Sequence, residues 1–195
     1  MEQTPKKRGQ YAKGEQRREE ILDRAVEAFG RLGYHATSMR EIASSCGLSQ
    51  AGLLHYFPNK EALLLALVQR REAETKIGTG GDHWVTEILR QVELNESEKA
   101  LTQLWANLVG EATDPDFPAH SYFVSRYDET RASLSAQFAE NNGRDKPNEE
   151  DQMKGALLAA MWDGLQTQWL LDPSFDMKET FKYGMSLLAD ESPEK

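Results

Sequence analysis

The strongest constraint on the fold is a run of helix start and stop signals within residues 37–63. Ser38, followed three residues later by Glu41, has the pattern of a capping box, in which two side chains satisfy the first backbone N–H groups of a helix. Gly47 ends that helix, because glycine adopts positive φ at little cost. The signals therefore predict a short helix over about 39–46.

A second short helix follows directly. Ser49 is a favourable N-cap for a helix over about 50–56, and Pro58 stops that helix. Asn59 then caps a further helix that continues to about Glu74. Two short helices joined by a tight turn at a glycine are typical of a helix-turn-helix.

Apolar residues recur at spacings of three and four on both sides of this motif, which is the period of an amphipathic helix. One such helix runs from Glu15 to Leu32 and stops at Gly33. Beyond the motif, the same period predicts helices over about 83–94, 97–112, 119–141, 149–171 and 176–189. No segment alternates like a strand, so the sequence predicts an all-α protein of about nine helices.

Composition narrows the class of protein. With 195 residues and 39% hydrophobic residues, the chain can bury a core. No apolar run reaches the roughly 18 residues that span a bilayer, and the polar, basic N-terminus lacks the apolar stretch of a secretory signal, so we expect a cytoplasmic protein. The single cysteine, Cys46, excludes an internal disulfide; we expect it in the core with Met39 and Ile42, among apolar neighbours and without a redox role.

Charge is separated along the chain. Residues 1–72 hold 12 Lys and Arg against 9 Asp and Glu, whereas the rest hold 11 against 23, which together give the net charge of −9. Residues 1–14 form the predicted flexible basic arm, and six cations lie in the first 18 residues. Such an arm can follow a phosphate backbone, although the same composition also fits a solvated tail.

The domain boundary is expected at residues 77–82, Ile-Gly-Thr-Gly-Gly-Asp, which do not support a helix and coincide with the change in charge. The predicted scheme after the arm is a helix-turn-helix domain over 15–60, a connecting helix over 61–76, a C-terminal helical domain over 77–190 and a tail over 191–195.

The start of the second short helix has the chemistry of a base reader. Gln50 carries a carboxamide that can donate to and accept from adenine at once. Ala51 and Gly52 would let the backbone approach DNA closely, and Ala51 could touch a thymine methyl; both residues could equally be small for packing.

Polar groups around that helix could bind phosphate. His55 and Tyr56 lie on it, and Lys60 begins the next helix. Such contacts would fix the register on DNA without reading sequence, and the helix N-termini near Ser38 and Ser49 could add N–H donors. For His55, an ordinary packed or surface role remains open.

The stretch resembles the DNA-binding domain of the tetracycline-repressor (TetR) family. The resemblance rests on Thr37-Ser38-x-x-x-Ile42-Ala43, Gly47-Leu48-Ser49 and Leu53-x-x-Tyr56-Phe57-x-Asn59-Lys60-Glu61-x-Leu63. Carried over position by position, it implies DNA contacts at Thr37, Ser38, Ser49, Gln50, Ala51, Gly52, His55, Tyr56 and Lys60. The chain departs from the family at Leu54, where many members have an aromatic residue, so we expect a different specificity.

The resemblance also implies that the C-terminal helical domain binds a small molecule and forms a homodimer. Residues 163–173 look like the end of the penultimate helix in a subgroup of the family. The candidate pocket residues are Trp105, Leu108, Val109, Tyr122, Phe123, Tyr127, Phe138, Met161 and Trp162, with Asp163 and Gln166 as possible polar anchors. Aromatic residues and methionine at helical spacing are also ordinary core residues.

The expected dimer seam is built from residues 150–171 and 176–189. Its predicted members are Leu157, Ala160, Met161, Gly164, Leu165 and Gln168, with Phe181, Met185 and Leu188. Small residues in the first segment would let the helices approach closely.

The resemblance implies a ligand-responsive transcriptional regulator, a repressor by the family's habit, that releases a palindromic operator in double-stranded DNA when a hydrophobic or amphipathic molecule binds. The alternative is a ligand-binding or protein-binding module with a vestigial DNA-binding head. We expect no enzyme, because the chain has neither a phosphate-binding loop nor a nucleophile elbow and its four histidines are scattered. No cofactor or metal site is predicted.

Overall fold

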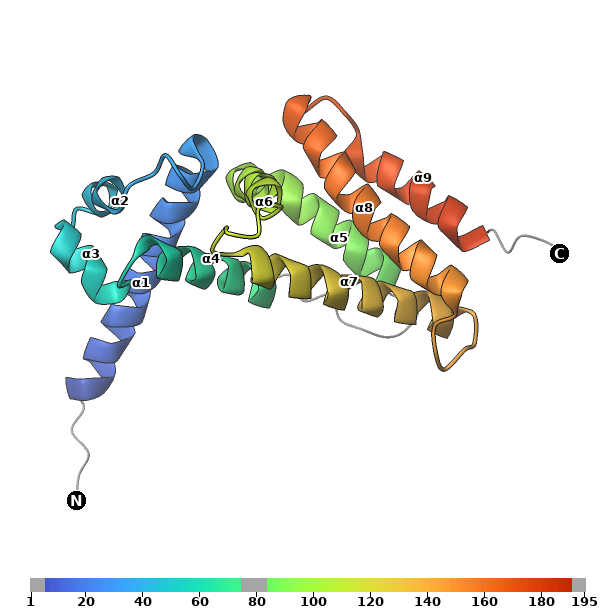
Figure 1. The fold of residues 1–195 in the computed structure, drawn as a ribbon, viewed down its shortest axis with the longest axis horizontal. Coiled ribbons are helices and arrows are strands. Elements are labelled where there is room, and N and C mark those ends of the chain that lie inside the picture. The colour runs from blue at the N-terminus through green and yellow to red at the C-terminus, as the bar shows by residue number, and fades with distance from the viewer. Residues whose placement is uncertain (1–5, 75–83, 191–195) are drawn as a thin grey trace, which may run out of the picture. The chain divides into compact units, whose positions relative to one another are not determined.

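The computed structural model describes residues 6–74 and 84–190, and every regular element in these ranges is an α-helix (Figure 1). The helices are α1 (Lys6–Leu32), α2 (Met39–Ser45), α3 (Gln50–Tyr56), α4 (Lys60–Glu74), α5 (Trp84–Ser97), α6 (Lys99–Glu111), α7 (His120–Asn141), α8 (Glu149–Leu171) and α9 (Met177–Asp190). The predicted all-α class is confirmed. None of these helices is long and apolar enough to cross a membrane.

The chain divides into two compact units, an N-terminal unit that ends at Glu74 and a C-terminal unit that begins at Thr75. The predicted linker at 77–82 and the predicted tail at 191–195 lie outside the described residues. α4 was predicted as a separate connecting helix. It packs on α1, and Arg70 of α4 forms ion pairs with Glu19 and Asp23 of α1, so α4 belongs to the N-terminal unit.

The core of the N-terminal unit is a single apolar layer between α1 and the three helices that follow. Ile21, Leu22 and Phe29 of α1 are fully buried, as the three-and-four spacing predicted. α1 begins at Lys6 rather than at residue 15. Lysine, arginine, glutamine and alanine dominate residues 6–13, and these good helix formers extend the helix beyond the part that the core requires.

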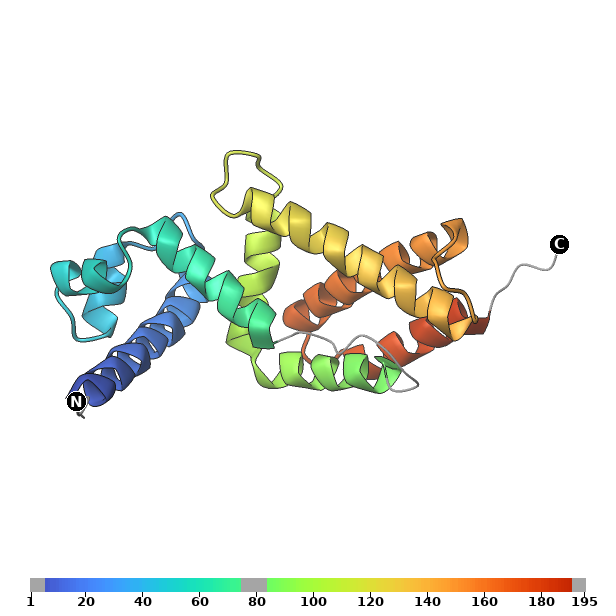
Figure 2. The same cartoon turned by 90° about the horizontal axis from the view of Figure 1, so that it is seen from below.

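The C-terminal unit packs α8 between α7 and α9, with α5 and α6 completing the bundle (Figures 1 and 2). The observed limits of α5 to α9 lie within three residues of the predicted ones. Gly155 lets α8 approach α7 closely, since a Cβ there would lie 2.5 Å from Oγ of Ser135 and 2.8 Å from its backbone N. A capping box of Asn148 and Asp151 begins α8.

One face of α8 and α9 remains apolar and exposed. The exposed large apolar residues on it are Met153, Leu157, Leu171, Tyr183 and Leu187. Leu165, Phe181 and Met185, which we predicted in a dimer seam, are instead buried in the chain's own core. The buried and the exposed stripes of α9 lie on opposite sides of one helix, and the sequence period alone does not say which stripe faces inward.

Candidate nucleic-acid interface and effector site

The turn between α2 and α3 has the geometry that the sequence predicts. Gly47 takes a φ of +65°, and the N–H of Leu48 donates to the carbonyl of Ala43 at 2.8 Å. The Ser49 hydroxyl accepts from the N–H of Gly52 at 3.0 Å and so caps α3. The corner therefore fixes the start of α3 through backbone bonds and one side-chain cap.

α3 presents one exposed face and buries the other. Leu53 and the C-cap residue Phe57 are buried in the N-terminal unit. The exposed residues of the helix are Gln50, Ala51, Leu54 and His55. Of the α3 residues predicted to contact DNA, Gln50, Ala51 and His55 lie on this face, whereas Gly52 and Tyr56 are half-buried beside it.

Packing does not require a glycine at position 52. A Cβ added there would meet Oγ of Ser49 at 3.4 Å and side-chain atoms of Leu48 at 3.7 Å and beyond, which are ordinary contacts. The sequence left open whether this residue is small for packing or for approach to DNA. Packing inside the chain therefore does not explain the glycine, and approach to DNA stays a prediction.

Two predicted contact residues already use their hydroxyls as helix caps. The Ser38 hydroxyl accepts from the N–H of Glu41 and donates to its carboxylate at 2.8 Å, which completes the predicted capping box. Two hydrogen bonds lower the pKa of Glu41 below its usual value: the bond from the Ser38 N–H, which has the larger effect, and the bond from the Ser38 hydroxyl. Ser49 caps α3 in the same way. These caps hold the helix starts in place, and DNA contacts by the two serines stay predictions.

Thr37 and Lys60 also use their polar groups inside the unit. Thr37 is buried, and its hydroxyl donates to the carbonyl of Gly33 at 2.8 Å and contacts that of Ala28 at 3.2 Å. The ammonium of Lys60 donates to the carbonyls of Tyr34, His35 and Thr37 at 2.9, 3.4 and 3.1 Å. Lys60 also lies 4.3 Å from the centre of the Tyr34 ring. Both residues therefore fasten the loop between α1 and α2.

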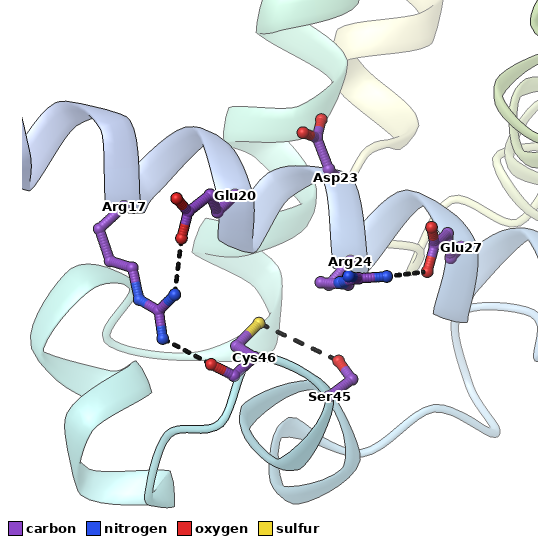
Figure 3. Close-up of a pocket in the computed structure, with 7 residues that line it drawn as sticks. All are labelled: Arg17, Glu20, Asp23, Arg24, Glu27, Ser45 and Cys46. Carbon is purple, nitrogen blue, oxygen red and sulfur yellow. Dashed lines mark hydrogen bonds and ion pairs between the residues drawn. The ribbon is translucent and has the colours of Figure 1, made fainter.

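A polar cavity of about 360 Å³ lies between α1 and the end of α2 (Figure 3). It is lined by Arg17, Glu20, Asp23, Arg24, Glu27, Ser45 and Cys46. Arg17 donates to Glu20 at 2.6 Å and to the carbonyl of Cys46 at 2.5 Å. The prediction that Cys46 has apolar neighbours in the core is wrong, because it ends α2 half-buried beside Arg17 and Ser45. Of the lining charges, Arg17 pairs with Glu20 and Arg24 with Glu27, while Asp23 pairs with Arg70 of α4.

In the C-terminal unit, the candidate pocket residues fall into two groups. Trp105 of α6 lies against Tyr122 and Phe123 of α7, with ring centres 6.5 and 5.1 Å away. Met161 and Trp162 of α8 instead pack against the core with α9, as do Phe138 of α7 and its neighbours. Leu108 and Gln166 are buried, and Val109 and Tyr127 are half-buried. The candidates therefore do not line a single surface.

A polar pair joins α7 to α8 near the first of these groups. The Tyr127 hydroxyl donates to Oδ2 of Asp163 at 2.5 Å. Burial raises the pKa of Asp163, although Tyr127 and then Arg126 favour its charged form. Burial, and then the bond to Asp163, raise the pKa of Tyr127 well above its ordinary value. The sequence left open whether Asp163 faces outward, and the structure places it against α7.

Two further residues complete this region. Arg126 has its guanidinium carbon 4.9 Å from the centre of the Trp105 ring. Gln166 is one helical turn from Asp163 and 5% exposed.

Sequence reasoning missed two features of these sites. Leu54 lies on the exposed face of α3, but we noted it only as a departure from a family pattern. Arg126 was not considered, because its approach to Trp105 joins two helices and leaves no local signal.

Comparison with known proteins connects these features to a family. Residues 21–67 match the family described as bacterial regulatory proteins, tetR family. The HTH-type transcriptional regulator RutR of Escherichia coli K12 is 42% identical over 50 residues, which are 26% of this chain and 24% of RutR. The chain thus spans about a quarter of the length of the first curated relatives that it matches.

Solved structures share the fold over most of the chain. The SmeT–triclosan complex aligns with a TM-score of 0.71 at 17% identity, over 88% of this chain and 89% of SmeT. NalD of Pseudomonas aeruginosa, named as the secondary repressor of the MexAB-OprM multidrug efflux pump, aligns with a TM-score of 0.70 at 21% identity, over 91% of this chain and 95% of NalD. Through the helix-turn-helix at residues 21–67, the chain is similar to the tetR family of bacterial regulatory proteins.

Proposed function

We propose that this protein is a cytoplasmic transcriptional regulator that binds a palindromic operator as a homodimer and releases it when a small molecule binds. The observation that carries the proposal is the exposed face of α3, held by a capped start and a glycine turn within a tetR-type domain. The named function of its relatives is transcriptional regulation, which also favours a non-enzymatic role.

Base reading is assigned to the exposed start of α3. Gln50 can pair with adenine through both ends of its amide, which contributes roughly 1–3 kcal/mol of discrimination. Ala51 and Gly52 allow close approach to the groove. His55 and Tyr56, whose rings lie edge to face at 5.7 Å, are placed to contact phosphate at its rim.

The remaining predicted contacts act mainly by holding the reading head in shape. Ser38 and Ser49 cap the two short helices, while Thr37 and Lys60 fasten the loop before them. The helix starts keep backbone N–H groups that can face a phosphate.

The homodimer is assigned to the exposed apolar face of α8 and α9. Met153 and Leu157 are more than half exposed, and Ala160 and Gly164 continue the same stripe at spacings of three and four. A self-complementary pair of such faces, related by a two-fold axis, would bury this surface. Two DNA-binding units are needed because one short helix contacts too few bases.

Leu157→Arg tests this interface. A charge in the middle of the face should convert dimers to monomers in sedimentation equilibrium and strongly weaken operator binding. Val124→Arg is the matched control, because Val124 is 48% exposed on α7, against 57% for Leu157 on α8. If both variants sediment like the wild type, the dimer is not built on this face.

The effector is assigned to the region around Trp105, Tyr122, Tyr127 and Gln166. Aromatic rings near the polar pair of Tyr127 and Asp163 suit a molecule that is mostly apolar and carries one polar group. A fold shared with a complex of triclosan and with a named repressor supports an amphipathic effector and repression. An effector that binds more tightly to a conformation in which the two DNA-binding units are displaced lowers the affinity for DNA. By linkage, DNA lowers the affinity for the effector by the same factor.

Selection from random duplexes at two salt concentrations tests the proposal. A palindromic motif and a steep salt slope are expected, because phosphate contacts release counterions. Gln50→Ala should relax the preference at one adenine in each half-site. Sequence-blind or absent binding would instead favour a ligand-binding or protein-binding module with a vestigial head.

A further inference from the structure

The middle of the exposed face of α3 is apolar. With about 100° of rotation per residue, Leu54 lies about 40° and Ala51 about 100° around the helix from Gln50, and His55 lies at about 140°. The two apolar residues therefore occupy the centre of the face, and the two polar residues lie at its edges. Leu54 is the large one, and 39% of it is exposed.

Leu54 is not among the residues that bury α3 in the core. The contacts of α3 with the core are made by Leu53 and Phe57, which are 0% and 2% exposed. In the described part of the N-terminal unit, the other exposed large hydrophobic residue is Leu32, at the end of α1. An apolar side chain in the centre of a reading face is therefore free to contact DNA.

The floor of the major groove offers one apolar group to such a side chain. Guanine, adenine and cytosine present donors and acceptors there, and thymine adds its 5-methyl group. Leucine can neither donate nor accept, and placing it on a donor or a phosphate would remove water from a polar group without replacing the hydrogen bond. Its favourable position is over a methyl group.

We propose that Leu54, supported by Ala51, reads the 5-methyl group of a thymine in each operator half-site. This inference rests on the proposed function, and it assigns one base preference of the same site. Because Gln50 borders the apolar centre, the thymine lies within a base pair or two of the adenine assigned to Gln50.

Removing the methyl group alone is the direct test. Each thymine of the selected operator is replaced in turn by deoxyuridine, which keeps the base pair and every hydrogen-bonding group. At one position per half-site, this replacement should lower the affinity of the protein for the operator roughly fourfold. That factor corresponds to about 0.8 kcal/mol, the free energy of burying one methyl-sized group. Replacement in both half-sites should lower the affinity about 15-fold if the two half-sites are independent.

Three variants assign the effect to Leu54. Leu54→Ala should lose most of the preference for thymine over deoxyuridine, whereas Leu54→Met, which keeps a large apolar side chain, should still prefer thymine. Leu32→Ala is the matched control, because Leu32 is 38% exposed on α1, and it should keep the wild-type ratio. The helical content of each variant is compared by circular dichroism.

A second base analogue separates the methyl group from the rest of thymine. Replacing the critical T·A pair by C·G should weaken binding, and 5-methylcytosine at that position should restore about fourfold. Operator binding that is indifferent to deoxyuridine everywhere, or a Leu54→Ala variant that keeps the preference, overturns the inference and leaves the proposed function standing. Absence of any salt-dependent, sequence-selective binding overturns both.

Discussion

Lys60 gives the sharpest test of which contacts stabilise the N-terminal unit. Sequence reasoning assigns its ammonium to a DNA phosphate, whereas the structure directs it to three backbone carbonyls in the loop between α1 and α2. Lys60→Met keeps the length of the side chain and its packing on the Tyr34 ring but removes the charge and all three donors. The N-terminal unit should lose stability even without DNA.

The size of the loss follows from the contacts. Hydrogen bonds that involve a charged group contribute about 1.5–3 kcal/mol, and Lys60 is half-buried, so water replaces part of what is lost. We expect a loss of about 1–3 kcal/mol in the free energy of unfolding of the N-terminal unit. For a unit of this size, each kcal/mol lowers the melting temperature by about 4–8 °C.

Two spectroscopic signals separate the two units. The four tryptophans lie at positions 84, 105, 162 and 169, all in the C-terminal unit, so their fluorescence follows that unit alone. Lys60→Met should shift the melting transition seen by far-ultraviolet circular dichroism and leave the fluorescence transition in place. Lys13→Met, which removes an exposed lysine of α1, is the matched control and should shift neither transition.

A second measurement asks whether Lys60 also binds phosphate. Losing one phosphate contact reduces the slope of affinity against salt concentration by about one. We expect an unchanged slope for Lys60→Met, because the ammonium is engaged within the unit. A variant as stable as the wild type, with a reduced slope, would refute the reasoning from the structure and support the phosphate assignment.

Three further predictions concern the C-terminal unit. Gly155→Ala should destabilise it by about 1–3 kcal/mol through the clash with Ser135, whereas Gly110→Ala, whose Cβ meets nothing within 4 Å, should be neutral or slightly stabilising; tryptophan fluorescence during urea unfolding measures both. Tyr127→Phe should leave the tyrosinate absorbance at pH 10–11 unchanged, because the raised pKa keeps Tyr127 protonated there, and a clear drop would contradict the buried pair. Burial raises the pKa of Asp163, so its contribution to stability is present below pH 4 and is lost as pH rises through the folded-state pKa. Asp163→Asn, which can still accept a hydrogen bond from Tyr127, should abolish that loss. A variant whose melting temperature depends on pH as the wild type's does would contradict this prediction.

The helices and the turn were predictable because their signals are local. The Ser38 and Glu41 capping box, the glycine at 47 and the cap at Ser49 each act within four residues of sequence, and each forms as predicted. Several helix limits in the C-terminal unit were equally accessible, since the segments 113–118, 142–148 and 172–176 contain glycine or proline and the Asn148 cap begins α8. The exposed face of α3 follows from the same period.

The features that the sequence did not predict depend on contacts between residues that are far apart in the chain. Lys60 meets the carbonyls of residues 34, 35 and 37, and Tyr127 meets Asp163, across 23 residues of sequence or more. Cys46 has apolar sequence neighbours on one side, but its environment is set by Arg17 from another helix. The extension of α1 to Lys6 was missed for a different reason, because that part of the helix carries no core pattern to detect.

The hydrogen bonds inside the head also narrow the set of residues that can read DNA. Thr37, Ser38, Ser49 and Lys60 have polar groups committed to caps and carbonyls, so moving them to DNA would break bonds that hold α2 and α3 in place. The exposed groups of α3 are the Gln50 amide, the Ala51 and Leu54 methyl groups and the His55 ring, and the half-buried Tyr56 lies beside His55. Such a small face spans only a few base pairs, and sequence discrimination by one head is correspondingly limited. Specific binding would therefore require a second DNA-binding unit at a fixed distance, so the proposed dimer face of α8 and α9 would determine operator recognition as much as α3 does.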